Sequence, residues 1–297
     1  MSKILVTGAS GHLGRLVIKH LLETEKVPAS DVVAGTRDPG KLADLAARAV
    51  EVRAVDFDAA DMLAGAFAGI DRVLVISTDA LDVPGKRVTQ HKAAIAAAAA
   101  AGVKRIFYTS MPAPETSAVT FAWEHRESEE AVKATGVPYT IFRDGWYMQN
   151  LFHSLPRAVE TGQWYTSAGA GKTAHISRDD TARAIAAGLK SEEGEGRTYT
   201  LTGDTPRTNA EIAELVSKVT GKPVAVVDLT DEQLAGGMKA AGVPEFAVPT
   251  LVSFDRNTRE GHIAMATEDF GRLTGRKPQS LEDFLAENKA VLLGGGH

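Results

Sequence analysis

Short apolar runs rich in β-branched residues alternate with longer amphipathic or alanine-rich stretches over the first half of the chain. The runs have the length and composition of buried strands, and the stretches between them have the length of helices. This alternation predicts βαβ units, and therefore a doubly wound parallel sheet with right-handed crossovers. The predicted strands cover residues 3–7, 31–36, 51–56, 72–77, 104–109 and 138–143.

Glycines mark several boundaries of these elements. Gly69, Gly102 and Gly136 each stand shortly before a predicted strand. A glycine in the left-handed conformation commonly ends a helix, so these three residues are predicted to be helix stops.

The regular alternation loosens after residue 146, and residues 162–172 are rich in small side chains. A further helix and strand are expected to return to the sheet, and a mixed set of elements follows them. These elements are a helix at 179–190, a strand at 198–203, a helix at Asn209–Thr220, an edge strand at 224–228, and acidic-capped helices near Asp231 and Ser280.

This organisation predicts one large α/β domain and one smaller mixed α/β C-terminal lobe. The large domain is expected to comprise residues 1–150, with 174–203 returning to its sheet. The lobe is expected to comprise residues 151–173 and 204–297. A chain of 297 residues is too short for two large domains of equal size.

Composition narrows the class of partner. The formal net charge of −5 leaves no broad basic surface, which argues against nucleic acid and in favour of a small molecule. The absence of cysteine excludes disulfides, thiolate metal ligands and a cysteine nucleophile, and it fits a reducing cytoplasm. No apolar run reaches the ~18 residues of a membrane span. We expect a soluble cytoplasmic monomer or homodimer without a metal, since His12, His20, His153 and His175 are isolated singles.

A glycine-rich turn follows the first predicted strand, in the pattern Gly-x-x-Gly-x-x-Gly. Such spacing lets the backbone approach a pyrophosphate and turns the amide hydrogens of a helix N-terminus toward it. The usual fingerprint is Gly-x-Gly-x-x-Gly, and the alternative is a purely structural turn, but the strand before it and the helix after it match the required context. A Rossmann-type dinucleotide site is predicted at Gly8, Ser10, Gly11, His12, Leu13 and Gly14.

The end of the second predicted strand indicates which dinucleotide binds. It lacks the carboxylate that would accept the ribose 2′-hydroxyl of NAD, and Arg37 and Lys41 can clamp a 2′-phosphate. NADPH is therefore expected, with NADH weaker, unless both cations lie on a solvated helix start. Asp38 would repel the phosphate unless it caps the following helix. Asp56 and Phe57 are expected adenine contacts, although packing also explains Phe57.

The tyrosine and lysine pair of ordinary short-chain dehydrogenases is absent. The positions four residues after the five tyrosines are Pro112, Arg143, Leu151, Gly169 and Gly203. Chemistry that needs mainly a well-placed hydride remains, and quinone reduction is of this kind because the hydroquinone anion collects its proton from water or a weak donor.

Taken together, the motifs resemble the NmrA-like atypical short-chain dehydrogenases, and in particular the type 2 NAD(P)H:quinone oxidoreductases. The resemblance runs over nearly the whole chain, best to residue 150 and looser after 205. The motifs are the glycine turn, Arg37-Asp38-Pro39, Ile76-Ser77-Thr78, Gln90-His91, Tyr108-Thr109-Ser110, Glu124-His125 with Glu129, and Arg143-Asp144-Gly145-Trp146-Tyr147.

The resemblance implies places for several residues. The segment 143–147 would lie beside the nicotinamide and the quinone, the segment 76–78 would lie under the cofactor, and Arg178 would lie near the site. The remaining expected cofactor contacts are Ile76, Ser77, Thr78, Thr109, Ser110, Arg143, Gly145, Trp146 and Arg178.

Two positions depart from the family pattern. The family usually has Asn where this chain has Asp144, and Glu where it has Gln149. A carboxylate beside the nicotinamide would attract the positive ring of NADP⁺, and it would serve as a proton donor if burial raised its pKa. Relatives also act in aromatic polyketide pathways, which makes a polycyclic quinone a candidate substrate.

His125, Asp144 and Tyr147 are the candidate catalytic residues. His125 would donate a proton to the reduced substrate, or it would simply bond to neighbours on its helix, whereas His91 is expected to be structural. Trp146, Tyr147 and Phe152 would stack on a flat ring, or they would pack into the core.

Three functions remain open at this stage. The first is an NADPH-dependent quinone reductase, and the second is a regulatory protein that senses NADP(H) without turnover. The third is an isomerase that uses the nucleotide transiently.

Overall fold

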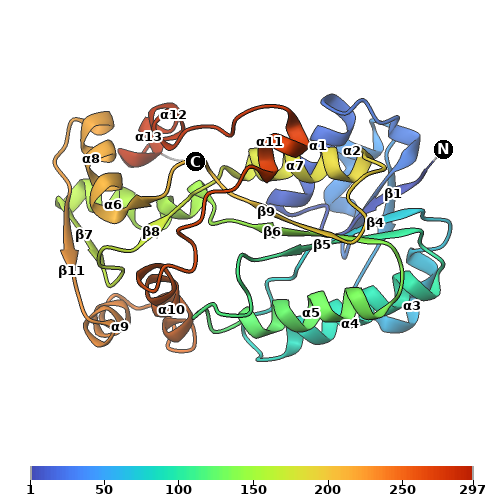
Figure 1. Ribbon diagram of the computed structural model, residues 1–297, viewed down its shortest axis with the longest axis horizontal. Helices are drawn as coiled ribbons and strands as arrows, with labels where there is room; N and C mark the ends of the chain where they lie inside the picture. The colour runs from blue at the N-terminus through green and yellow to red at the C-terminus, as the bar shows by residue number, and fades with distance from the viewer. Residues whose placement is uncertain (1, 296–297) are drawn as a thin grey trace.

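Seven parallel strands form the central sheet of the computed structural model, which describes residues 2–295 (Figure 1). Their spatial order is β3-β2-β1-β4-β5-β6-β9, so the order reverses between β1 and β4, where open α/β sheets bind ligands. This arrangement confirms the predicted doubly wound fold. The strands are β1 (Ile4–Val6), β2 (Val32–Thr36), β3 (Glu51–Ala54), β4 (Arg72–Val75), β5 (Arg105–Ser110), β6 (Tyr139–Asp144) and β9 (Arg197–Leu201).

Helices cover both faces of this sheet, as Figure 1 shows. Alternate residues of β5 point to opposite faces, with Phe107 in one core cluster and Ile106 and Tyr108 in the other. One layer contains α1 (His12–Glu23), α2 (Ala43–Ala46), α7 (Arg178–Lys190) and α11 (Asp269–Thr274). The other layer contains α3 (Ala60–Ala66), α4 (Lys86–Ala100) and α5 (Ala122–Ala134).

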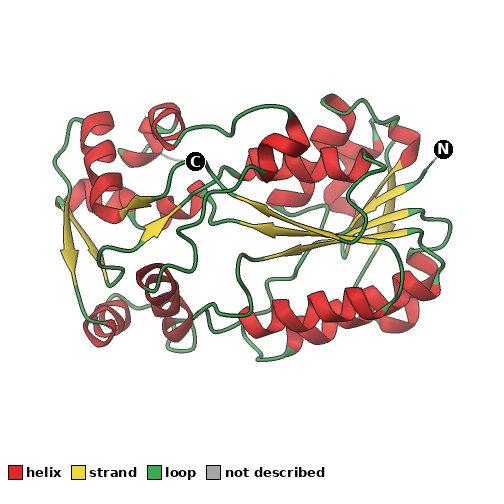
Figure 2. Ribbon diagram, in the orientation of Figure 1, coloured by secondary structure: helices red, strands yellow, loops and turns green. Residues whose placement is uncertain are grey.

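A smaller lobe lies beyond the carboxyl ends of the strands (Figure 2). It has its own apolar core, in which Trp164, Ile212 and Leu285 are buried. Its two small sheets pair β7 (Gln163–Thr166) with β11 (Ala225–Asp228), and β8 (Lys172–Thr173) with β10 (Arg207–Thr208). Its helices are α6 (Leu155–Thr161), α8 (Asn209–Thr220), α9 (Asp231–Ala240), α10 (Val248–Arg259), α12 (Leu281–Glu287) and α13 (Lys289–Leu292).

Local signals fix most helix ends. Gly69, Gly102 and Gly136 have φ angles of 71°, 75° and 70°, as expected for helix stops. Thr208 and Thr230 begin α8 and α9 with capping boxes, in which each threonine and the residue three positions later satisfy each other's backbone amides. The helix expected near Ser280 is α12, with Ser280 as its N-cap.

The fourth strand ends earlier than its composition predicted. Beyond Val75 the amide of Ile76 donates to the Thr7 hydroxyl, and the amide of Ser77 donates to the Thr109 hydroxyl, each at 2.9 Å. The hydroxyl oxygens thus replace the carbonyl oxygens to which these amides would donate in a β-sheet. The chain leaves the sheet here while the amides of Ile76 and Ser77 remain hydrogen-bonded. The elements that were not predicted include β7, β8, β10, α6, α10, α11 and α13.

The sheet and the lobe are joined at the end of β6. Gly145 donates its amide hydrogen to the carbonyl of Leu201 on β9 at 2.8 Å, and a Cβ on Gly145 would lie 2.5 Å from that oxygen. Trp146 and Met148 then bond to both backbone groups of Ile176. Within the described part of the chain, no helix has the length and apolar character needed to span a membrane.

Gly14 allows α1 to pack against the turn that precedes it, because a Cβ there would lie 2.4 Å from the Gly8 carbonyl oxygen. We expect Gly14→Ala to lower the melting temperature by at least ~2 °C, since overpacking costs ~1–3 kcal/mol and each kcal/mol is worth roughly 2–4 °C in a chain of this size. Thermal unfolding measures the change. Gly65→Ala is the control, because no atom lies within 4 Å of its added Cβ; equal melting temperatures for the two variants would contradict the packing argument.

Candidate active site

The glycine turn leaves the first amides of α1 without a side-chain cap. Gly8 has a φ of +60°, and Gly11 is the N-cap of α1 with no side-chain hydrogen bond. Gly11 and His12 are exposed, Leu13 is half-buried, and the Ser10 hydroxyl is 2.9 Å from the Thr36 hydroxyl. Uncapped helical amides at an exposed turn are the donors that a pyrophosphate needs, so the turn fits a dinucleotide.

The segment after β2 presents cations to the same edge of the sheet. Asp38 caps the short 3₁₀ helix Pro39–Leu42, and its carboxylate accepts the Gly40 amide hydrogen at 3.0 Å. Arg37 is exposed. Its charge contributes to the lowered pKa of Asp58, but no hydrogen bond or ion pair within residues 2–295 holds its guanidinium. The Asp38 carboxylate is therefore bonded to the helix that it caps. This is the condition under which Arg37 and Lys41 can bind a 2′-phosphate although Asp38 lies beside them.

Arg15, which the sequence did not single out, also lies here. Its guanidinium donates to the Lys41 carbonyl at 2.5 Å and to Asp44 at 2.9 Å. Arg15 therefore holds the backbone of the predicted clamp. Asp56 accepts the Asp58 amide hydrogen at 3.1 Å, and Phe57 packs against the core, so local structure also accounts for this pair.

The segment 76–78 lies against the glycine turn, with the Cβ of Ile76 3.6 Å from the position of a Cβ on Gly8. The Thr109 hydroxyl is 3.3 Å from that of Ser77, and the Thr78 amide donates to His91 Nε2 at 2.9 Å. The structure thus brings Gly8, Ile76 and Thr109 together at the carboxyl edge. His91 has the structural role expected of it.

Arg143 and Ser110 are held by one buried carboxylate. Arg143 donates to both oxygens of Glu129, at 2.9 and 2.7 Å, and it also pairs with Glu115. The Ser110 hydroxyl donates to Glu129 at 2.6 Å. These hydrogen bonds fix the two residues at the strand ends, and their contact with the cofactor stays a prediction.

Asp144 ends β6 with a carboxyl group that is almost completely buried. The Tyr147 hydroxyl donates to its Oδ2 at 3.1 Å, while its Oδ1 has no hydrogen-bond partner within residues 2–295. Burial raises the pKa of Asp144 to about 8, and burial followed by the Asp144 charge raises the pKa of Tyr147 well above its usual value. Asp144 is thus mainly a neutral acid at neutral pH, as the sequence analysis required of a proton donor.

Arg178 lies on the other side of this pair. Its guanidinium is 4.9 Å from the centre of the Tyr147 ring, and its backbone amide donates to Gln149 at 3.0 Å. Burial lowers the pKa of Arg178, and no carboxylate within residues 2–295 pairs with it. An unpaired, half-buried guanidinium is suited to binding an anionic part of a ligand.

His125 is buried, and both of its ring nitrogens are engaged. Nδ1 is 3.1 Å from the Tyr108 hydroxyl, and Nε2 is 2.9 Å from the Arg87 guanidinium, which also pairs with Glu124. Burial and the Arg87 charge lower the pKa of His125 well below its usual value. These partners lie on β5 and α4, not on the helix of His125, and they give the ring a structural role; its role as a proton donor stays a prediction.

A cavity of about 380 Å³ lies between the end of β6 and the lobe. Trp146 is half-buried at its wall and meets Phe254 of α10 edge to face at 4.8 Å between ring centres. Phe152 stacks on Phe284 at 5.3 Å and belongs to the lobe core. Of the predicted aromatic group, Trp146 thus lines the cavity and Phe152 belongs to the lobe core. Phe254 and Asp255 form part of the cavity wall, and no local sequence motif predicted them. Among residues 2–295 no group of histidines and carboxylates could hold a metal ion.

Comparisons with known proteins identify the family and its relatives. The model of the NmrA-like family matches residues 1–262. Quinone oxidoreductase 2 of Escherichia coli is 36% identical over 280 residues, which cover 94% of this chain and 96% of that protein. NAD(P)H azoreductase of Xenophilus azovorans is 30% identical over 289 residues, covering 97% and 98%.

Two solved structures have nearly the same fold over the whole chain. The NADPH complex of the Escherichia coli quinone oxidoreductase has a TM-score of 0.91 at 35% identity and covers 96% of this chain and 99% of that one. Triphenylmethane reductase of Citrobacter sp., complexed with NADP(H), has a TM-score of 0.90 at 34% identity and covers 97% and 100%.

The 2′-phosphate clamp is tested by Arg37→Ala. Loss of a charge-assisted hydrogen bond, worth ~1.5–3 kcal/mol, is expected to raise the KM for NADPH about tenfold or more and to leave the KM for NADH nearly unchanged. Steady-state kinetics with both nucleotides measures the difference. Arg48→Ala is the control, because Arg48 is bound to Glu23 on the surface. Equal increases of the KM for NADPH and for NADH would contradict the binding of a 2′-phosphate by Arg37.

Proposed function

The chain belongs to the NmrA-like family, and from the geometry of its site we propose that it is an NADPH-dependent oxidoreductase that transfers hydride to a quinone. We assign nucleotide binding to residues 1–150 with 174–203, and acceptor binding to residues 151–173 and 204–297. The uncapped amides of α1, the exposed Arg37 and the unpaired Arg178 support the first assignment. The aromatic cavity beside Trp146 supports the second. The quinone and azo substrates in the names of the relatives agree with an electron-poor acceptor.

The buried acid Asp144 is the observation that carries the proposal. When bound, the nicotinamide supplies the hydride, and a quinone that has gained a hydride needs one proton to become a hydroquinone. Asp144 holds such a proton at neutral pH, because burial raises its pKa to about 8. The Tyr147 hydroxyl orients Oδ2 and stabilises the carboxylate that remains after the proton has moved to the quinone oxygen. This pair takes the place of the missing tyrosine and lysine.

The aromatic lining of the cavity supports extending the proposal to polycyclic aromatic quinones, including those of polyketide type. Its walls include Trp146, Trp164 and Phe254, whose rings can pack against the faces and edges of a fused ring system. Packing of this kind positions and desolvates the acceptor, which is the principal requirement for hydride transfer.

The proposal predicts that NADPH absorbance falls when a naphthoquinone or an anthraquinone is added to the purified protein. One hydroquinone is expected for each NADPH consumed, because hydride and proton account for both hydrogens. Tight NADPH binding without oxidation across a panel of quinones would instead indicate the regulatory sensor. Product formation without net loss of NADPH would indicate an isomerase.

The role of Asp144 predicts a pH dependence. The acid form donates the proton, so kcat is expected to be constant below pH 8 and to fall about tenfold per pH unit above it, as the carboxyl group with a pKa of about 8 loses its proton. Asp144→Asn is expected to lower kcat about tenfold or more and to abolish this limb.

Asp204→Asn removes a comparable but exposed carboxylate and is expected to keep the wild-type profile. If Asp144→Asn keeps the wild-type limb, the proton comes from another group.

A further inference from the structure

The cavity between β6 and the lobe combines aromatic walls with one carboxylate. Trp146, Trp164, Tyr165 and Phe254 line it, together with Asp255. The described residues that line this cavity include no lysine or arginine. Its fixed charge is therefore negative, and the faces of its aromatic rings add further negative potential.

Asp255 lies on α10 and is held from one side only. Its Oδ2 accepts hydrogen bonds from the Thr166 hydroxyl and the Ser167 amide, both at 2.7 Å. Its Oδ1 accepts no hydrogen bond from residues 2–295, and no ion pair within that range includes Asp255. One oxygen thus fixes the side chain, and the other remains for a ligand in the cavity.

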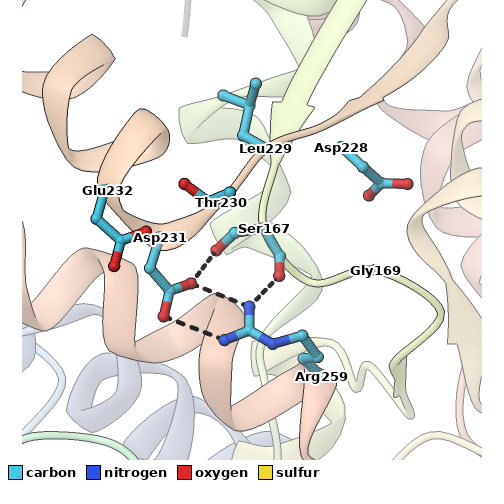
Figure 3. A pocket seen from close by; sticks show the side chains of 8 residues that line it. All are labelled: Ser167, Gly169, Asp228, Leu229, Thr230, Asp231, Glu232 and Arg259. Carbon is cyan, nitrogen blue, oxygen red and sulfur yellow. Dashed lines mark hydrogen bonds and ion pairs between the residues drawn. The ribbon is translucent and has the colours of Figure 1, made fainter.

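The neighbouring arginines are already bound, as Figure 3 shows for Arg259. Arg259 donates to both oxygens of Asp231, at 3.0 and 3.1 Å, and also to the Ser167 carbonyl. Arg256 donates to Asp231 at 2.8 Å. This cluster lines a separate pocket of about 350 Å³, where Asp228 and Glu232 add further negative charge.

These charges also act on Asp255 from a distance. Burial raises the pKa of Asp255, the two hydrogen bonds and the Arg259 charge lower it, and the Asp231 charge raises it again. The effects of Arg259 and Asp231 on Asp255 thus oppose each other, and the Arg259 guanidinium is itself bound to Asp231.

The histidines do not reverse this character. Burial lowers the pKa of His175 to about 4, so that His175 is neutral at neutral pH. Its Nδ1 has no hydrogen-bond partner within residues 2–295. His153 lines the cavity but is exposed to solvent.

We propose that this cavity selects acceptors by charge, binding aromatic acceptors that carry a quaternary or protonated amino group and rejecting those that carry a sulfonate or carboxylate. The positive group pairs with Oδ1 of Asp255, and the rings lie along Phe254 and Trp146 toward the end of β6. Coulomb attraction to Asp255 and cation–π attraction favour either cation, and a protonated amine also donates a charge-assisted hydrogen bond to Oδ1. Coulomb repulsion from Asp255 opposes the anion. For turnover, this inference rests on the proposed function.

Three naphthoquinones that share one ring system and differ in one substituent test the proposal. The substituents are trimethylammoniomethyl, hydroxymethyl and sulfonatomethyl, and kcat/KM is measured with NADPH for each. In Asp255→Asn, kcat/KM for the cationic quinone is expected to fall about tenfold or more, that for the neutral one to change less than about twofold, and that for the anionic one to rise. Each value is divided by the wild-type value for the same quinone, so that differences in reduction potential cancel.

Asp228→Asn and Asp255→Glu are the matched controls. Asp228 is an exposed carboxylate of the neighbouring pocket, and its loss is expected to leave the preference intact. Asp255→Glu keeps the charge and is expected to keep most of the preference for the cation. Thermal unfolding of each variant identifies any that is not folded. Equal changes for all three quinones in folded Asp255→Asn, or the same pattern in Asp228→Asn, would overturn the charge selection.

A binding measurement separates this inference from the proposed function. Calorimetry with benzyltrimethylammonium and with toluenesulfonate needs no turnover. Binding of the cation alone, weakened in Asp255→Asn, together with no NADPH oxidation by any quinone, would support the cavity and reject the reductase. Oxidation of all three quinones without any charge preference, and no binding of the cation, would reject the cavity and support the reductase.

Discussion

The close contact between Gly145 and Leu201 determines where both halves of the site lie. Gly145 donates its amide hydrogen to Leu201 at 2.8 Å, and the space beside that carbonyl has no room for a Cβ. The contact continues the pairing of β6 with β9 by one residue, which keeps Asp144 inside the protein. After Gly145 the chain turns toward Ile176 and forms backbone hydrogen bonds with it, and this path places Trp146 in the wall of the cavity. The burial of Asp144 and the position of Trp146 in the cavity wall thus both depend on the close contact between the backbones of Gly145 and Leu201.

Burial without ionic partners leaves three ionisable groups mainly neutral. Desolvation lowers the pKa of His91 to about 3 and that of His175 to about 4, and it raises the pKa of Asp144 to about 8. Each of these groups is therefore mainly neutral at neutral pH. Of the three, only Asp144 has a pKa near the pH at which a reductase would work. The fixed charges then come from other residues, Arg178 beside Tyr147 and Asp255 in the cavity wall.

Sequence reasoning succeeded where the signal is local. Strand periodicity, the glycine stops and the capped starts of the helices near Asp231 and Ser280 each depend on neighbouring residues. It failed where the environment comes from remote residues. Asp255 receives its hydrogen bonds from residues 89 and 88 positions away, and His125 meets Arg87 across 38 positions. No spacing rule links such distant residues. The sequence therefore could not predict that Phe254 and Asp255 line the cavity, or that both ring nitrogens of His125 have hydrogen-bond partners.

The hydrogen bonds on Asp144 and Asp255 differ in a way that suits the two roles that we propose for them. Burial raises the pKa of both carboxyl groups. Within residues 2–295, Asp144 has a single donor, the Tyr147 hydroxyl, and one buried oxygen without a partner, so little opposes the effect of burial. Asp255 receives two donors on one oxygen, and these oppose the effect of burial. A carboxyl group that keeps its proton can give it away, and a carboxylate can pair with a cation. The two sets of donors therefore support proton transfer by Asp144 and cation recognition by Asp255 as separate proposals.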